Sequence, residues 1–151
     1  MPGAAALYWI APEAATAVPA LSAALQDSDN TVRRLSSLAL ARIGPGARSA
    51  VPALIQVLAD EDGRVRGAAI SALGRIGPDA AAVLLEALQK DKTACIRAAA
   101  AAALPAIPGQ APSAVPALIG AMKDADAGVR AAAAQALKKI DPQAAKKAGV
   151  K

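Results

Sequence analysis

Apolar residues recur along this chain with the period of an α-helix. Counted from Val65 as position 0, they fall at positions 0, 3, 4, 7, 8 and 11. These positions share one face of a helix with about 3.6 residues per turn. A shorter apolar stripe from Val51 to Leu58 precedes them, and a mostly charged run separates the two stripes. Residues 51–76 therefore predict two short helices joined by a tight loop.

The pattern of the second helix occurs four times. An aliphatic–Arg dipeptide marks position 0 at spacings of 33, 31 and 33 residues: Val32-Arg33, Val65-Arg66, Ile96-Arg97 and Val129-Arg130. Leucine follows at position 8 and isoleucine at position 11: Leu40 and Ile43, Leu73 and Ile76, Leu104 and Ile107, Leu137 and Ile140. Such a period is typical of stacked supersecondary units.

Three sets of residues mark the expected helix ends. Prolines stand in the first turn of the first helix, where a missing amide hydrogen costs little: Pro19, Pro52 and Pro116. Aspartates are placed to N-cap the second helix: Asp29, Asp62 and Asp126. Glycines supply a left-handed residue after it: Gly44 and Gly77. In the third unit Thr93 replaces the aspartate and should still cap, whereas Pro105 should kink the second helix or end it early.

These residues carry a family resemblance. The stretch VPALIQVLADEDGRVRGAAISALGRIGP resembles the short bacterial HEAT-like repeat, a type also found in phycobilisome lyases. The resemblance implies an all-α, right-handed α-solenoid of antiparallel helix pairs, an α-α superhelix with one core along the stack. It also implies a non-enzymatic scaffold for protein–protein interaction. The signatures of tetratricopeptide and ankyrin repeats, whose periods are similar, are absent.

The repeat template organises residues 1–151 as a single domain of about four helix pairs. Residues 1–14 form a half repeat, because Leu7, Ile10 and Pro12 fall at positions 8, 11 and 13 of a second helix. The predicted repeats are 15–46, 47–78, 79–110 and 111–142, followed by a basic tail at 143–151. The tail could begin another first helix.

Composition argues against catalytic and metal chemistry. The chain has no histidine, which removes the commonest general base and metal ligand. A lone cysteine, Cys95, can build neither an internal disulfide nor a cysteine-based zinc site. Proline or charge interrupts every apolar run before the roughly 18 residues that a membrane span needs. The sequence predicts a cytoplasmic protein that is not an enzyme, has no cofactor and has no membrane partner.

Positive charge is concentrated at one end of the chain. The net charge is +5, and residues 138–151 hold five lysines against Asp141. Residues 1–137 carry twelve basic and eleven acidic groups. Nucleic-acid-binding proteins usually spread a basic stripe along their surface. Nucleic acid is therefore not the expected partner, and binding through the basic C-terminal end is the second alternative function.

Paired acids and a few unusual side chains are the other candidates for chemistry. The acid pairs are Asp27 with Asp29, Asp60 with Asp62, and Asp124 with Asp126. Their recurrence favours helix caps and a ladder to the arginines over catalysis, which needs one pair once. The family resemblance also gives the first alternative, an accessory subunit similar to a bilin lyase, with Cys95 as a site for bilin attachment. No further lyase motif is present, and an incidental cysteine is the favoured interpretation. Tyr8 and Trp9 either anchor a partner or cover an open end of the stack.

The predicted binding surface is the outward face of the second helices. Positions 2, 5, 6 and 9 lie opposite the apolar stripe: Arg34, Ser37, Leu38, Ala41; Gly67, Ile70, Ser71, Gly74; Ala98, Ala101, Ala102, Pro105; Ala131, Ala134, Gln135, Lys138. The face is small-residued and mostly uncharged, and Leu38 with Ile70 would form an apolar patch. We expect it to bind an unknown protein or peptide, with self-association through this face or the open ends as a further possibility. The candidate contacts are Arg34, Leu38, Ile70, Gln135, Lys138, Tyr8 and Trp9.

Overall fold

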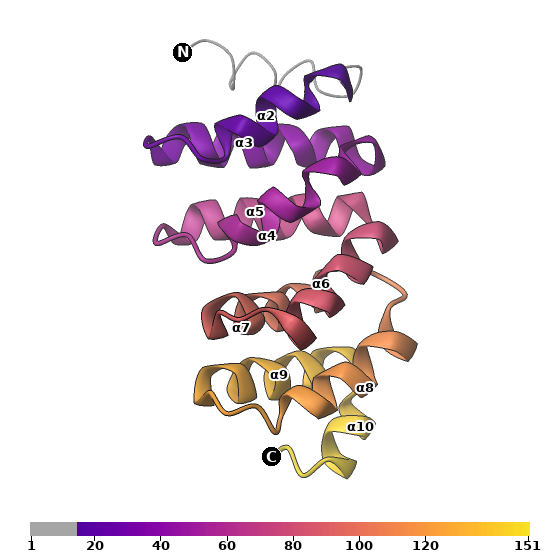
Figure 1. Ribbon diagram of the computed structural model, residues 1–151. Helices are drawn as coiled ribbons and strands as arrows, with labels where there is room; N and C mark the ends of the chain where they lie inside the picture. The colour runs from indigo at the N-terminus through magenta and orange to yellow at the C-terminus, as the bar shows by residue number, and fades with distance from the viewer. Residues whose placement is uncertain (1–14) are drawn as a thin grey trace. The chain divides into compact units, whose positions relative to one another are not determined.

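The described part of the chain is helical throughout. The computed structural model describes residues 15–151, and every regular element in that range is an α- or 3₁₀-helix (Figure 1). The chain divides into two compact units, Met1–Ala80 and Ala81–Lys151. The division falls in the first turn of helix α6 (Pro78–Lys90).

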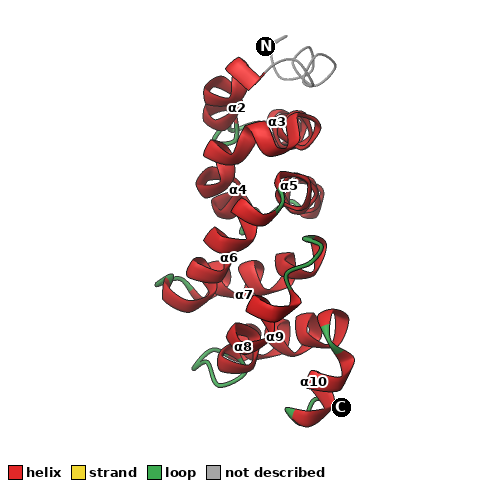
Figure 2. Ribbon diagram, turned by 90° about the vertical axis from the view of Figure 1, so that its right-hand side faces the viewer, coloured by secondary structure: helices red, strands yellow, loops and turns green. Residues whose placement is uncertain are grey.

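The described part of unit 1 contains two helix pairs. Their elements are η2 (Ala15–Ala17), α2 (Val18–Ala24), α3 (Asn30–Ile43), η3 (Gly44–Ala50), α4 (Val51–Val57) and α5 (Gly63–Ile76). The longer second helices, α3 and α5, lie side by side, and the short first helices α2 and α4 lie on one side of them (Figure 2). Pro19 and Pro52 stand in the first turns of α2 and α4, as predicted.

Leucine and alanine form the core of unit 1. The largest completely buried side chains are Leu21, Leu25, Leu40, Leu54, Val51, Val65 and Leu73. Ala39, Ala69 and Ala72 are also fully buried and lie on the predicted stripe. Because alanine has a short side chain, the helix backbones can pack closely without aromatic filling. The helical period therefore predicted the buried face of α5 correctly, whereas on α3 three residues of the stripe, Val32, Leu35 and Ile43, are only half-buried.

Unit 2 has the same design. Its elements are α6, α7 (Ala94–Ala103), η4 (Leu104–Ala106), α8 (Ala111–Ala121), α9 (Ala127–Ile140) and α10 (Pro142–Lys147). Helix α9 packs against α7, α8 and α10. The large buried side chains are Leu84, Leu104, Leu118, Val129 and Leu137.

The helix ends confirm some of the sequence predictions and contradict others. Helix α7 stops at Ala103 and a 3₁₀ turn containing Pro105 follows, as expected for a residue that cannot donate to the helix. Thr93 occupies the N-cap position of α7, but its hydroxyl makes no capping hydrogen bond, so that prediction was wrong. Helix α8 begins at Ala111 rather than near Val115, which leaves Pro116 inside the helix.

The three predicted aspartate caps are confirmed. Their carboxylates accept backbone amides of the first helical turn, from Thr31 to Asp29 at 2.7 Å, from Arg64 to Asp62 at 2.8 Å and from Val129 to Asp126 at 3.0 Å. Gly44 and Gly77 end α3 and α5 with φ of 69° and 90°. Their ψ angles of −135° and −142° place them outside the left-handed helical well, in a region that only glycine adopts easily.

No helix in residues 15–151 combines the length and apolar character needed to cross a bilayer.

Candidate functional site

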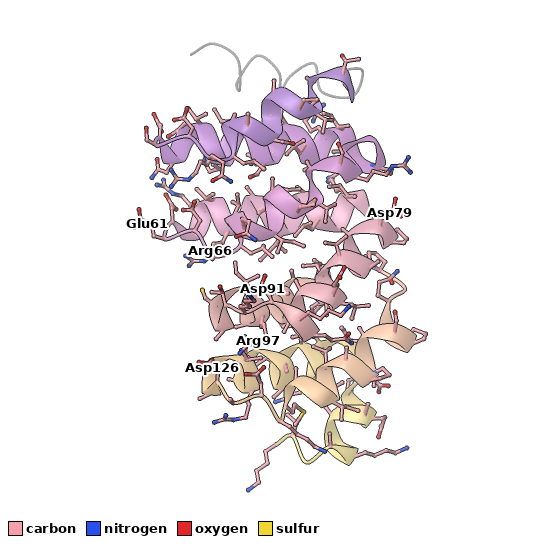
Figure 3. All side chains as sticks on the ribbon, viewed as in Figure 1. Glu61, Arg66, Asp79, Asp91, Arg97 and Asp126 are labelled. Carbon is pink, nitrogen blue, oxygen red and sulfur yellow. The ribbon has the colours of Figure 1, made fainter. Side chains whose placement is uncertain are left out.

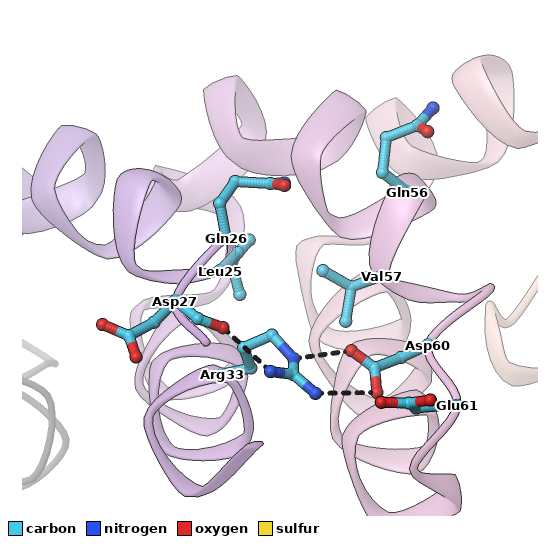
Figure 4. Close-up of a pocket in the computed structure, with 8 residues that line it drawn as sticks. All are labelled: Leu25, Gln26, Asp27, Arg33, Gln56, Val57, Asp60 and Glu61. Carbon is cyan, nitrogen blue, oxygen red and sulfur yellow. Dashed lines mark hydrogen bonds and ion pairs between the residues drawn. The ribbon is translucent and has the colours of Figure 1, made fainter. Parts of the chain in front are cut away.

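An arginine joins consecutive helix pairs in unit 1. Arg33 donates two hydrogen bonds to the Asp60 carboxylate, from Nε to Oδ2 at 2.7 Å and from Nη2 to Oδ1 at 3.2 Å (Figure 4). Its Nη1 donates to two carbonyls of its own loop, Asp27 O at 2.8 Å and Ser28 O at 3.0 Å. One guanidinium thus holds its own loop and the loop of the next repeat together. We call this arrangement the Arg–Asp joint.

Unit 2 contains a second Arg–Asp joint with the same geometry. Arg97 donates from Nε and Nη2 to the Asp124 carboxylate at 2.9 and 3.0 Å, and from Nη1 to Asp91 O at 2.9 Å. Such bidentate, charge-assisted pairs are among the stronger hydrogen bonds in proteins. Figure 3 shows Asp91, Arg97 and Asp126 at the loop edge of this unit.

The two acids of each loop have different structural roles. The first acid accepts the backbone amide two residues further on, as in Asp60 with Asp62 and Asp124 with Asp126, both at 2.9 Å. The second acid caps the helix. Each carboxylate therefore already has partners that shape the loop, and no group of three or more metal-ligating side chains occurs within residues 15–151.

Hydrogen bonds from arginine hold the carboxylates in their charged form. The side-chain hydrogen bond from Arg33 is the main cause that lowers the pKa of Asp60, against the opposing effect of burial. Arg97 lowers the pKa of Asp124 in the same way. Arg64 bonds the Asp62 carboxylate and brings its pKa to about 2, with a smaller contribution from Asn30 of the preceding repeat. These shifts fit permanently charged structural groups rather than acids that exchange protons near neutral pH.

A shallow hollow lies beside the joint in each unit. In unit 1 it measures about 280 Å³ and is lined by Leu25, Gln26, Asp27, Arg33, Gln56, Val57, Asp60 and Glu61 (Figure 4). In unit 2 a hollow of about 270 Å³ is lined by Leu88, Gln89, Pro116, Ala117, Gly120, Ala121 and Asp124. Arg33, Asp60 and Asp124 are committed to the joints, and the other charged residues of the lining are Asp27, whose carboxylate accepts the Asp29 amide, and Glu61. The hollows therefore follow from repeat packing.

The predicted binding face is only partly exposed. Gln135 and Lys138 are exposed, whereas Arg34, Leu38 and Ile70 are half-buried. Tyr8 and Trp9 lie outside the described residues. Three members of the predicted face are buried, so their assignment was wrong: Ser37, Ala41 and Ala101.

Packing between second helices explains this error. Ser37 and Ala101 are both at position 5, on helices α3 and α7, and each of these helices lies against the next second helix of its unit. Position 5 therefore faces the neighbouring repeat, and Ser37 donates its hydroxyl to Arg33 O at 3.0 Å instead of contacting solvent. Periodicity identifies the buried face of one helix, but it does not show which flank a neighbouring helix covers.

The side chains that point outward follow positions 2, 6 and 10, one turn apart. In unit 1 they form what we call the outward ridge: Arg34, Leu38 and Arg42 on α3, and Gly67, Ser71 and Arg75 on α5. All six are exposed or half-buried. The sequence prediction missed Arg42 and Arg75. Their signal was present, because a basic residue occurs at position 10 in three repeats, the third being the exposed Lys139.

The remaining sequence candidates lie at exposed positions. Cys95 is a free, exposed thiol at the start of α7. All five C-terminal lysines are exposed, and Lys138 Nζ donates to Lys151 O at 2.9 Å. The most exposed large aliphatic side chain among the described residues is Ile119, on α8, at 37%. It lines a hollow of about 310 Å³ with Met122, Lys123 and Ala148.

Comparison with known families identifies the class. Residues 18–105 and 96–148 match the HEAT-repeat family. The chain belongs to that family, and its fold is an α-solenoid, as predicted. HEAT-repeat proteins typically act as scaffolds for protein interaction. A comparison with curated proteins finds no match.

Solved structures show the same fold at low sequence identity. The structure of crescerin, which uses a TOG domain array to regulate microtubules in the primary cilium, is similar to this chain, with a TM-score of 0.65 and 22% sequence identity. The likeness covers 87% of this chain and 66% of that one, and at this identity it shows the fold alone. Two engineered proteins are 26% and 27% identical, with TM-scores of 0.47 and 0.49. Each likeness covers 97% of this chain, and 77% and 46% of the engineered chains.

Proposed function

We propose that this chain is a non-enzymatic interaction scaffold that binds a protein or peptide along the outward ridge of unit 1. The observation that carries the proposal is the composition of that ridge. Leu38 is half-buried on α3, which packs beside α5. On α5 the ridge residues Gly67 and Ser71 have no side chain or only a short one. A partner side chain or backbone can approach closely at small residues, with Leu38 as the apolar contact.

The charges of the ridge indicate the chemistry of the partner. Arg34 and Arg75 bring positive charge to the ridge, and none of its positions is acidic. Complementary charge speeds encounter and selects among partners. The expected partner segment is therefore acidic and carries one aliphatic anchor. We propose the cytoplasm as its location.

The experiment is selection from an unbiased displayed peptide library on the full chain. Enriched peptides should be acidic, and their binding should weaken as salt rises, because exposed charges are screened. Leu38→Glu should weaken the selected peptides by about tenfold or more, the equivalent of roughly 1.4 kcal/mol. Arg75→Glu should have a similar effect without touching any buried group, because Arg75 is exposed.

A matched control separates the ridge from general charge effects. Arg48 is exposed on η3 and does not belong to the outward ridge, and Arg48→Glu makes the same change in charge as Arg75→Glu. Binding should survive this change, and circular dichroism should show all variants equally helical. The proposal fails if no peptide is enriched, or if the selected peptides bind the three variants and the unaltered chain equally.

A further inference from the structure

The hollow in unit 1 is lined by polar side chains that have no partner. The carboxamides of Gln26 and Gln56 and the carboxylate of Glu61 make no hydrogen bond or ion pair with any other described residue. Figure 4 shows the two glutamines at one end of the hollow and Glu61 at the other, beside the joint of Arg33 and Asp60. All three unpaired residues are exposed. They can therefore bind a ligand without breaking a contact that holds the fold.

The repeat template does not require these side chains. The first helices of the second and fourth repeats contain the same five residues, VPALI, so their positions can be compared directly. Gly120 occupies the position of Gln56, and Ala125 occupies that of Glu61. A hollow still forms in unit 2, with about 270 Å³ against about 280 Å³ in unit 1. Gln56 and Glu61 therefore change the chemistry of the hollow without being needed to form it.

The lining of the unit 1 hollow is negatively charged. It contains three acidic residues, Asp27, Asp60 and Glu61, and one basic residue, Arg33, a balance of −2. Because Arg33 and Asp60 neutralise one another in the joint, the charges of Asp27 and Glu61 remain. Among the described residues that line the unit 2 hollow, Asp124 alone is charged, and the arginine of its joint neutralises it. Electrostatic attraction therefore favours a cation in the unit 1 hollow over one in the unit 2 hollow.

The size and the acceptors of the hollow indicate which cation fits. Its volume of about 280 Å³ is far larger than a metal ion needs and lies just below the roughly 300–1,000 Å³ of small-molecule sites, so it suits one long side chain. Arginine presents five N–H donors in a planar group. The Glu61 carboxylate and the amide oxygens of Gln26 and Gln56 can accept them. The buried Leu25 and Val57 form a floor along which the aliphatic part of the side chain can lie.

We propose that the unit 1 hollow binds an arginine side chain of a partner peptide. Glu61 receives the guanidinium, and the amide oxygens of Gln26 and Gln56 accept its remaining N–H groups. One side chain makes few contacts, so the expected dissociation constant is about 1 mM, too weak for enrichment from a peptide library. The site contains no residue of the outward ridge and does not depend on the function proposed for that ridge.

The test is an NMR titration of the isotope-labelled full chain with N-acetyl-arginine methylamide. The side-chain amide signals of Gln26 and Gln56 should shift, whereas that of Gln89 in the unit 2 hollow should not. The citrulline analogue has nearly the same shape without the charge and should bind about fivefold more weakly or worse. The lysine analogue should also bind more weakly, because its ammonium lacks the planar set of donors. Free arginine that binds better than the blocked residue would overturn the assignment to a peptide, because the negative lining should repel its α-carboxylate.

Matched variants identify the groups that hold the ligand. Glu61→Gln and Gln56→Ala should each weaken binding by about threefold or more. Glu86→Gln is the control, because Glu86 is exposed on α6 and does not line the hollow. Arg75→Glu on the outward ridge should leave arginine binding unchanged at physiological salt, so the two proposals fail separately.

Three results would overturn the proposal. In the first, the side-chain signals of Gln26 and Gln56 do not shift at any concentration of the arginine probe. In the second, the citrulline analogue binds as well as the arginine probe. In the third, Glu86→Gln weakens binding as much as Glu61→Gln does.

Discussion

At the scale of single residues, the aspartate carboxylates stabilise these loops as hydrogen-bond acceptors. Asp60 accepts a backbone amide and a guanidinium, and Asp62 accepts the amide that starts the next helix. The sequence predicted the caps because aspartate is strongly preferred at the position directly before the first residue of a helix. Thr93 occupies the same position but makes no capping hydrogen bond. The residue type shows that a side chain can cap a helix, but it does not show whether the side chain adopts the rotamer that does so.

Asp126 and Thr93 form a natural pair for testing the caps. Asp126→Ala should lower the free energy of unfolding by about 1 kcal/mol, because the amide of Val129 loses its acceptor. Thr93→Ala should change it by less than about 0.5 kcal/mol, because no capping bond is lost. Urea denaturation of both variants measures the difference. Equal losses would contradict the distinction between the two caps.

Asp62 provides a prediction about pH. Its pKa of about 2 in the folded chain lies below the usual aspartate value of 3.8, chiefly because Arg64 donates to its carboxylate. The folded state therefore binds the proton more weakly than the unfolded chain. Its stabilising contribution is complete above about pH 4 and is lost as pH falls through about 2.

Carbon-detected NMR titration of the Asp62 carboxyl group measures this shift directly. Arg64→Gln should move the pKa back toward 3.8. Arg66→Gln is the control, because Arg66 donates to the carbonyls of Asp60 and Glu61 and not to this carboxylate. A pKa that does not change in the Arg64 variant would show that another group holds it low.

At the scale of elements, two glycines in similar open surroundings have opposite roles. A Cβ added to Gly67 or to Gly77 would meet no atom within 4 Å. Gly67 lies inside α5, where glycine is a poor helix former, whereas Gly77 ends the helix with φ 90° and ψ −142°. Backbone conformation alone therefore decides the effect of a side chain at each position.

The two alanine substitutions should change stability in opposite directions. Gly67→Ala should stabilise the chain by about 0.5–1 kcal/mol. Gly77→Ala should destabilise it by about 1–3 kcal/mol, because an L residue is strained in that conformation. Thermal and urea unfolding measure both. A loss of stability in Gly67→Ala would contradict this prediction, because it would mean that other residues of the chain pack against α5 at Gly67.

The apolar periodicity predicted the helices well, but it did not predict which of their faces a neighbouring helix covers. The apolar stripe placed Val65, Ala69 and Leu73 in the core, because burial against the first helix repeats every turn. Contacts between second helices depend on how repeats stack. For this reason Ser37 and Ala101 were assigned to the outward face, although they are buried, and Arg42 and Arg75 were missed.

At the scale of the whole molecule, membership of the HEAT-repeat family explains the fold but does not identify a binding partner. The same template builds both units, and the Arg–Asp joint occurs once inside each of them. A repeat template encodes how helix pairs stack, so the residues it constrains are those of the core, the caps and the joints. The residues it leaves open, such as Leu38 and Arg75 of the outward ridge, are the ones available for recognition.

The most direct measurement is a map of the bound surface by NMR, using the isotope-labelled full chain and a peptide from the library selection. The account predicts that the largest shift changes occur at the amides of Arg34, Leu38, Gly67 and Ser71, in α3 and α5 together. Changes confined to the first helices α2 and α4, or to the loops that carry Asp27 and Asp60, would contradict it.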